Sequence, residues 1–236
     1  MRHAWLATGL VVACVASGPS PPAPGMSRAW GEVRLVPREG VTPGGRGAAS
    51  YGDRRLRDVE FVDYDRPGFA VVFAEAPSPP RGELSFSIRE TRVGTRIEPE
   101  HGAVGSGGRV IVRNETGDTH ILSYPAAELV RALAPGARLE AQVARAGEQG
   151  LYLVDRPTEA VVFAAPGPFA VVGATGRFTL PDLSPGTRRL RAWHPRFPTA
   201  EADVVLASGA SVRVDFDLGL GGEEGSHPHG GAHGSH

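Results

Sequence analysis

Histidines are the residues of this chain best suited to chemistry, and four of the eight lie in its last ten positions: His227, His229, His233 and His236. Gly, Pro, Ala and Ser separate them and cannot form a core, so we expect residues 220–236 to be a disordered tail. Neutral imidazoles bind Cu(II), Ni(II) and Zn, and glycine lets several of them converge on one ion. The tail is therefore either a metal-capture segment, with copper as the candidate cofactor, or a low-complexity end without a ligand.

Three further histidines lie in the part of the chain that is predicted to fold. His120 has three readings: a structural histidine bonded to a loop carbonyl at the rim of a sandwich, a weak Zn or Cu(II) site with His101 and Glu100, or a residue that faces a partner. His194 directly follows Trp193 in an apolar stretch, which favours packing or hydrogen bonding over ligation.

Sulfur is absent from the predicted domain. Cys14 is the only cysteine, and the two methionines, Met1 and Met26, also lie near the amino terminus. A blue-copper centre needs a cysteine thiolate and usually an axial methionine beside its two histidines. The sequence therefore argues against blue-copper electron transfer, and it excludes a disulfide within the domain.

Composition also argues against catalysis and nucleic-acid binding. Every basic residue is arginine, which excludes Schiff-base lysines and Walker lysines, and no GxSxG, HExxH or CxxC motif is present. Glu98 and Glu100 form the closest carboxylate pair of the predicted domain, in an ordinary turn context. The formal net charge is −1 and the arginines are scattered, so no basic surface is indicated. We predict a non-enzyme.

Residues 1–18 are typical of an export signal, with Arg2 followed by an apolar run over 4–16 and then Ser17 and Gly18. At about thirteen residues the run is too short for a permanent membrane helix, which needs roughly 20. Two routes remain open: lipidation at Cys14, or an ordinary signal peptide cut after Ala16. Residues 19–30, rich in Pro, Ser and Gly, are predicted to be a tether.

Apolar alternation from Glu32 onward predicts many short antiparallel strands and hence an all-β sandwich. In Glu83–Arg89, for example, Leu84, Phe86 and Ile88 share one face. The segment Ser211–Leu218 has the same pattern, whereas Ala126–Leu133 looks like a short helix behind Pro125. Residues 37–57, rich in Gly and Arg, are predicted to form a long exposed loop.

The stretch Gly108–Tyr124 (GRVIVRNETGDTHILSY) resembles plastocyanin-like cupredoxins, in particular methylamine-utilisation-type periplasmic proteins. In that family an apolar strand ends in Asn and a ligand His follows six residues later; Asn114, Asp118 and His120 match this pattern. The resemblance places the remaining copper ligands within 150–168, which holds no Cys, His or Met. It therefore implies a cupredoxin module with a degenerate copper site.

The stretch Pro168–Leu218 resembles carboxypeptidase regulatory-like domains, which are transthyretin-like sandwiches. The resemblance rests on the turn at Gly176, the phrase Leu183-Ser184-Pro185-Gly186 and the strand end Ala192-Trp193-His194-Pro195. Together the two resemblances imply an all-β, Greek-key sandwich, with a cupredoxin-like lobe over 31–166 and a carboxypeptidase regulatory-like lobe over 167–219.

The expected function is that of a non-catalytic cell-envelope binding or structural module. Its partner would be an envelope protein, peptide or glycan, and it would touch the membrane only through a lipid at Cys14. The alternative is a periplasmic protein that binds copper or another transition metal through the tail, with His120 as a further ligand.

Overall fold

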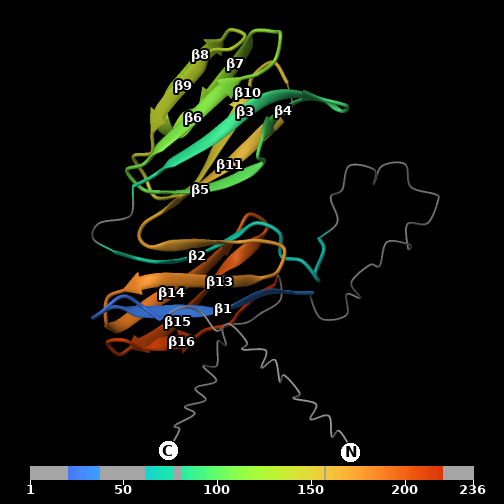
Figure 1. Cartoon of the computed structure of the whole chain (residues 1–236). Helices are drawn as coiled ribbons and strands as arrows, with labels where there is room; N and C mark the ends of the chain where they lie inside the picture. Colours follow the sequence, from blue (N-terminus) through green and yellow to red (C-terminus); the bar gives the residue numbers. More distant parts are fainter. Residues whose placement is uncertain (1–20, 38–61, 77–80, 157, 220–236) are drawn as a thin grey trace, which may run out of the picture.

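A computed structural model describes residues 21–37, 62–76, 81–156 and 158–219, which form 17 strands in two stacked lobes (Figure 1). The all-β sandwich that the alternation predicts is confirmed. Most strand pairs are antiparallel, but β1–β16, β1–β17, β3–β6 and β5–β11 are parallel. The predicted leader with Cys14, the 38–57 part of the loop and the tail histidines lie outside the described residues.

The upper lobe packs two sheets around one apolar core. Their orders are β5-β11-β10-β7-β8 and β4-β3-β6-β9. The strands are β3 (Glu83–Thr91), β4 (Gly94–Glu98), β5 (His101–Gly105), β6 (Arg109–Asn114), β7 (His120–Tyr124), β8 (Leu129–Leu133), β9 (Arg138–Gln142), β10 (Gly147–Leu153) and β11 (Thr158–Ala165). As the alternation predicts, Phe86 and Ile88 face this core, with Leu84 packed at its edge.

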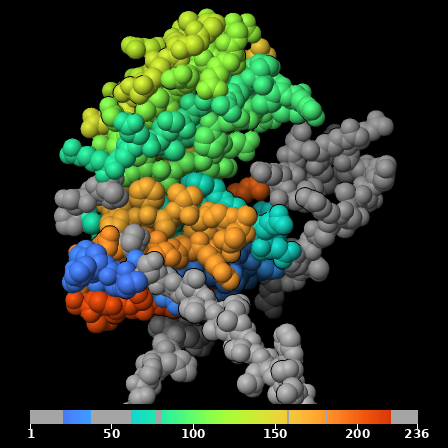
Figure 2. Space-filling view, viewed as in Figure 1, coloured from blue at the N-terminus to red at the C-terminus, as the bar shows by residue number. Residues whose placement is uncertain are grey.

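The lower lobe combines the two ends of the described chain. One sheet has the order β13-β1-β16, with β17 also paired to β1, and the other has the order β12-β2-β14-β15. The strands are β1 (Ser27–Val36), β2 (Ala70–Ala74), β12 (Phe169–Val172), β13 (Arg177–Leu183), β14 (Gly186–His194), β15 (Phe197–Leu206), β16 (Ser211–Arg213) and β17 (Phe216–Gly219). In Figure 2 blue and orange-red atoms accordingly share the lower lobe, and green and yellow atoms fill the upper one.

This pairing differs from the predicted division at residue 166. β1 and β2 pair with strands of the carboxyl-terminal segment, so the upper lobe is inserted between β2 and β12. Residues 27–30, assigned to the tether by composition, form the start of β1, and Ser27 and Ala29 are fully buried. Alternation shows which face of a strand is apolar, whereas the partner strand is chosen by contacts between residues far apart in sequence.

Two further segments differ from their predictions. The expected helix 126–133 is a single 3-10 turn, Pro125–Ala127, after which Glu128 adopts a left-handed backbone (φ 52°) and β8 pairs with β7. The expected strand Ser211–Leu218 is divided into β16 and β17. At the break the Val214 carbonyl approaches Gly31 so closely that a Cβ there would lie 1.8 Å from its oxygen, so only glycine fits.

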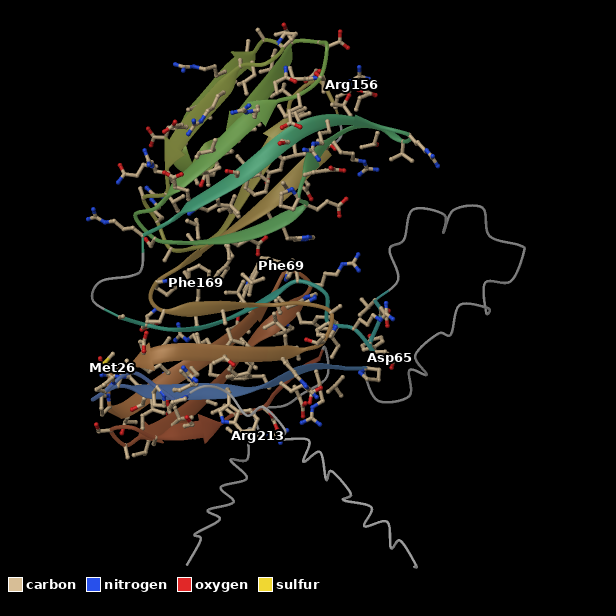
Figure 3. The ribbon with its side chains drawn as sticks, in the orientation of Figure 1. Met26, Asp65, Phe69, Arg156, Phe169 and Arg213 are labelled. Atoms are coloured by element: carbon tan, nitrogen blue, oxygen red, sulfur yellow. The ribbon has the colours of Figure 1, made fainter. Side chains whose placement is uncertain are left out.

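An aromatic junction joins the lobes. Val71, Phe73 and Trp193 of the lower lobe pack against Phe163 and Ala165 of β11. The Phe163 and Trp193 rings stack with centroids 4.5 Å apart. Figure 3 shows Phe69 and Phe169 in the same layer between the lobes. Offset aromatic pairs of this kind add about 0.5–1.5 kcal/mol each beyond burial, so the junction is a hydrophobic interface.

None of the elements in the described residues is a helix long and apolar enough to pass through a membrane.

Candidate functional site

His120 is the predicted site residue with the most defined surroundings. It begins β7 with its side chain 1% exposed, and each ring nitrogen has a partner. Nδ1 lies 3.1 Å from Asp155 Oδ2, and Nε2 lies 3.0 Å from Thr116 Oγ1. These partners are side chains and not the loop carbonyl expected from the sequence. The imidazole thus links the β6–β7 turn to the segment after β10.

Asn114, at the end of β6, holds that turn in place. Its Nδ2 donates to the backbone oxygens of Asp118 (2.8 Å) and Leu133 (2.9 Å). Its Oδ1 accepts from the backbone N–H and the hydroxyl of Thr116, at 3.0 and 2.8 Å. The amide is fully buried, uses both of its N–H donors, and has both groups of Thr116 within hydrogen-bond reach of its oxygen. It therefore fixes the loop that carries Thr116 to His120.

The electrostatics of Asp155 decide the tautomer of His120. Desolvation acts to raise the pKa of the Asp155 carboxyl, but hydrogen bonds from the His120 ring and from backbone groups of Asp155 and Ile121 outweigh it and lower the pKa. An ionised carboxylate only accepts hydrogen bonds, so His120 Nδ1 carries a proton and donates it to Asp155. The Nδ1 lone pair is then unavailable to a metal ion.

Nε2 is not accessible to a metal ion either. The Thr116 hydroxyl lies within hydrogen-bond reach of both Nε2 and Asn114 Oδ1, and its single proton serves one of them at a time. In either arrangement Nε2 faces Thr116 from inside a side chain that is 1% exposed. The order Asp155, His120, Thr116 is that of an acid-base-nucleophile triad. The cleft of about 760 Å³ in the upper lobe, however, is lined by β3, β4 and residues 99–100, and none of the three residues lines it.

The structure places His101 in different surroundings. It begins β5, and its ring stacks on Phe69 at 5.4 Å and 22° in the aromatic junction. The adjacent Glu100 accepts a hydrogen bond from the Val161 N–H through its backbone oxygen. Within the described ranges no group of three or more His, Cys, Asp and Glu residues is arranged to hold a metal ion. His101 and Glu100 are thus not seen to join His120 in a ligand cluster.

His194 also has both nitrogens occupied. Nδ1 accepts the Arg196 N–H at 3.0 Å, and Nε2 lies 3.1 Å from the Pro67 carbonyl, to which it donates. Burial lowers the pKa of His194, and nearby positive charge on Arg196 and His101 lowers it further, against the Pro67 hydrogen bond that raises it. The expected packing and hydrogen-bonding role fits this geometry. The ring ties β14 to the segment before β2.

The two carboxylates noted in the sequence, Glu98 and Glu100, line the cleft on β3 and β4. Glu98 lies 3.7 Å from the Arg89 guanidinium, which also forms a 2.8 Å ion pair with Glu115. Other lining residues are Ser85, Ser87, Thr91, Val93, Arg96 and Pro99. Glu98 thus belongs to an exposed surface on which arginine and carboxylate charges pair.

Sequence reasoning missed Asp155 and Thr116, the two partners of His120. Thr116 lies four residues before His120, within the Asn-containing turn, so the local pattern could have indicated it. Asp155 is 35 residues away and carries no local signal. Cys14 and the four tail histidines lie outside the residues that the structure describes.

Comparisons with known proteins give cupredoxins among solved structures. A purple cupredoxin from Nitrosopumilus maritimus is 17% identical and covers 35% of this chain and 99% of its own, with a TM-score of 0.31. Amicyanin, as the reduced P52G mutant, is 15% identical and covers 39% and 97% (TM-score 0.30). Pseudoazurin from Hyphomicrobium denitrificans is 14% identical and covers 35% and 75% (TM-score 0.30).

No protein-family model matches the chain, and no curated protein matches it. The likenesses to cupredoxins are partial, so the assignment of the fold rests on the strand pairings and cores described above and not on these neighbours.

Proposed function

We propose that this chain is a non-catalytic binding or structural module of the cell envelope. The observation that carries the proposal is that His120 and His194, the two buried histidines of the described residues, each have both ring nitrogens within hydrogen-bond distance of other groups of the fold. An imidazole held in this way ties strands together and has no lone pair directed at a ligand. These two histidines, which by residue type could bind a metal ion or exchange protons, therefore have a structural role in the fold.

The same geometry supports a non-enzymatic role. Asp155, His120 and Thr116 have the order of a hydrolytic triad, but a reacting group needs access to the nucleophile and a nearby oxyanion site. The Thr116 hydroxyl is occupied by Asn114 and His120, and the His120 ring is 1% exposed. We therefore expect ester hydrolysis at the buffer rate, unchanged by His120→Gln.

The finer family assignment is part of this proposal. The cupredoxin-like segment 108–124 forms β6 and β7 of the upper lobe. There Asp155 lies against the Nδ1 side of His120. The carboxypeptidase regulatory-like segment 173–195 spans β13 and β14 of the lower lobe. We infer a degenerate cupredoxin module inserted into a carboxypeptidase regulatory-like sandwich.

Export and anchoring complete the proposal. The signal-like residues 1–18 would deliver the protein to the periplasm or cell surface, where an envelope protein, peptide or glycan is the expected partner. A lipid on Cys14 would hold it at the membrane. Mass spectrometry of the mature amino terminus decides this, because a diacylglyceryl cysteine and an unmodified Ser17 differ in mass.

Metal titration tests the central part of the proposal. In a variant with His227, His229, His233 and His236 all changed to Ala, calorimetry with Cu(II) and with Zn(II) is expected to give no site. His120→Gln in that background would change nothing further. A Cu(II) site that persists without the tail histidines and disappears in His120→Gln would overturn the structural assignment of His120.

A second function, metal capture by the tail, is favoured by the spacing of its four histidines among glycines. It predicts that the unmodified chain binds Cu(II) and that the four-alanine variant does not. Absence of binding by the unmodified chain would remove this candidate while leaving the scaffold role in place.

A further inference from the structure

β8 is the last strand of the β5-β11-β10-β7-β8 sheet, and one of its two sides has no partner strand among the described residues (Figure 1). Hydrogen bonds of the neighbouring β7 show which backbone groups face that side. The Val154 N–H donates to the Ile121 carbonyl at 2.9 Å, so the backbone groups of Ile121 point toward β10. Successive strand residues direct these groups to opposite sides, so those of Leu122 point toward its register partner on β8, Arg131.

Val130 and Ala132, on either side of Arg131, therefore direct their N–H and C=O groups away from β7. Within the part of the chain that the structure describes, none of these four groups has a hydrogen-bond partner. Two N–H and two C=O groups, spaced two residues apart, are the pattern that a further strand needs from its neighbour. The free edge of β8 thus has the hydrogen-bonding pattern of an extended peptide.

Two other edge strands of the upper lobe are less available. The Thr95 carbonyl of β4 accepts a hydrogen bond from the Thr158 hydroxyl of β11 at 3.4 Å, so this edge faces the other sheet. β9 carries the ion pair of Arg138 and Glu140 along its outer face. Charged side chains along an edge disfavour strand addition. β8 differs, because Arg131 is its only charged residue.

The side chains on one face of this edge belong to an exposed cluster, which we call the apolar patch. The strand register places its members in two rows, namely Val130, Ser123 and Tyr152, and Ala132, Ile121 and Val154. Val130 is 70% exposed and Ile121 41%. Because directly opposite residues of paired strands share a face, a strand added to β8 would extend this patch. Apolar residues opposite Val130 and Ala132 would therefore be favoured in the partner.

Arg131 lies on the other face of β8. Leu133 on that face is buried and Leu129 packs against the upper core, whereas Arg131 is exposed and forms no ion pair within the described ranges. A partner residue opposite Arg131 would place its side chain beside the guanidinium. Opposite charges stabilise such a cross-strand pair. The partner strand is therefore expected to carry Asp or Glu at this position.

The same arginine argues against a second copy of this chain as the partner. In an antiparallel β8–β8 pair that used all four free groups, Val130 of each copy would lie opposite Ala132 of the other. The two Arg131 side chains would then lie directly opposite each other. Like charges in that position destabilise a strand pair. The edge therefore favours a different chain with an acidic residue at its centre.

We propose that β8 binds an extended peptide segment of a partner protein as an added antiparallel strand, with an acidic residue opposite Arg131 and apolar residues on either side of it. Main-chain hydrogen bonds to Val130 and Ala132 supply affinity, and the alternating side chains supply selectivity. The inference rests on the proposed binding role and names a peptide as its partner. Failure of the peptide to bind would leave the metal titrations of His120 unaffected, so the two proposals fail separately.

Fluorescence anisotropy with a designed peptide tests the proposal. The probe is a fluorescein-labelled, end-capped heptapeptide whose three central residues are valine, glutamate and valine, flanked by threonine and serine. With the mature, tag-free chain we expect a dissociation constant between about 10 μM and 1 mM, since a short edge buries little area.

N-methylated peptides provide a matched control that does not alter the protein. The amides of the two valines face β8 in the proposed register, so their N-methylation should weaken binding about tenfold or more. The amide of the glutamate faces away, so its N-methylation should change the dissociation constant less than about threefold. Equal effects of the two modifications would overturn the proposed register and with it the proposal.

Variants of the protein test the same contact from the other side. Ala132→Pro removes an outward N–H, which an edge strand tolerates, and should abolish binding while circular dichroism stays that of the folded chain. Arg131→Glu should weaken binding of the glutamate peptide about threefold or more and favour a peptide with central lysine. Arg177→Glu, at an exposed position of β13, is the control and should change the dissociation constant less than about twofold. If Ala132→Pro does not fold, the N-methylated peptides still decide.

Three results would contradict the proposal. The first is no binding of the peptide up to about 1 mM. The second is equal affinity for the glutamate and lysine peptides. The third is a dimer in sedimentation velocity that the peptide dissociates, because this would assign the edge of β8 to a second copy of the chain.

Discussion

The two sheet faces that meet at the aromatic junction differ outside it. The upper face continues as the exposed apolar patch of Ile121, Tyr152, Val154 and Val130, whereas the lower face becomes a network of arginines and carboxylates around Arg189 and Asp203. Both faces contribute buried aromatic rings to the same junction. Packing between the lobes therefore accounts for the apolar residues inside the junction but not for those beyond it.

Surface ion pairs and exposed apolar side chains also differ in their energetic roles. An exposed pair such as Arg189 with Asp203 contributes little to stability, because water and salt screen it, but keeps its surface hydrated. The apolar surface of an exposed valine, by contrast, is stabilised when it leaves water for another apolar surface. Stability should therefore be concentrated in the junction and the cores, and the surfaces beyond the junction should contribute little to it.

The largest effect is expected at the centre of the junction. Trp193→Ala removes the ring that stacks on Phe163 and contacts Phe69, and should lower the free energy of unfolding by about 3–5 kcal/mol. The lobes would then unfold in separate steps, visible in calorimetry as two transitions. Val154→Ala, in the patch, is the control and should cost less than about 0.5 kcal/mol. Similar losses for both variants would erase the distinction between junction and patch.

The second-largest effect is expected in the turn between β6 and β7, where hydrogen bonds of the Asn114 side chain should stabilise the upper lobe independently of the junction. Asn114→Ala leaves the Leu133 and Asp118 carbonyls and the Thr116 N–H without their partner, which should cost about 2–3 kcal/mol by urea denaturation. Asp118→Ala alters only an exposed side chain in the same turn and should be nearly neutral. If Asn114→Ala were equally neutral, the turn would not be held by this amide.

A third prediction concerns pH at the lower edge of the junction. Because the folded pKa of His194 is depressed, its stabilising contribution is present above the unfolded value near 6.5 and is lost as pH falls through the folded pKa. Urea midpoints should therefore fall on acidification, with a slope of at most about 1.4 kcal/mol per pH unit for one proton. In His194→Gln this part of the slope should vanish. An unchanged slope would assign the titration to another group.

The smallest effect is expected in the charged network. Arg189→Ala removes the ion pair with Asp203 and should change the free energy of unfolding less than Trp193→Ala or Asn114→Ala does, with the difference decreasing at high salt. Thermal unfolding at two ionic strengths measures it. A loss of unfolding free energy comparable with that of Trp193→Ala would mean that the charged face stabilises the protein as much as the junction does.

The sequence predicted the local features of this fold better than its long-range ones. Alternation placed Glu83–Arg89 in a strand with Phe86 and Ile88 inward, since that pattern depends on neighbouring residues alone. It could not place β1 beside β13 and β17, because those partners lie more than a hundred residues away. A short helix was predicted over residues 126–133, but in the structure β8 pairs with β7. A helix of eight residues is marginally stable on its own, so the strand pairing prevails.

The same limit applies to the candidate site. Asn114 and His120 were recognisable because they lie close together in one sequence motif, within residues 108–124. Asp155 was not, although it closes the Nδ1 side of the ring. The apolar patch depends on three strands in register, so Val130 and Tyr152 become neighbours of Ser123 only through tertiary pairing.

The most direct test of the account is a long-range ¹H–¹⁵N spectrum of the histidine rings. It would be recorded with and without Zn(II), in the variant whose four tail histidines are changed to Ala. Protonated Nδ1 of His120, bonded to Asp155, and protonated Nε2 of His194, bonded to Pro67, are predicted, with neither signal moving as Zn(II) is added. A His120 ring with unprotonated Nδ1 that shifts on Zn(II) addition would contradict the assignment of these histidines as structural ties.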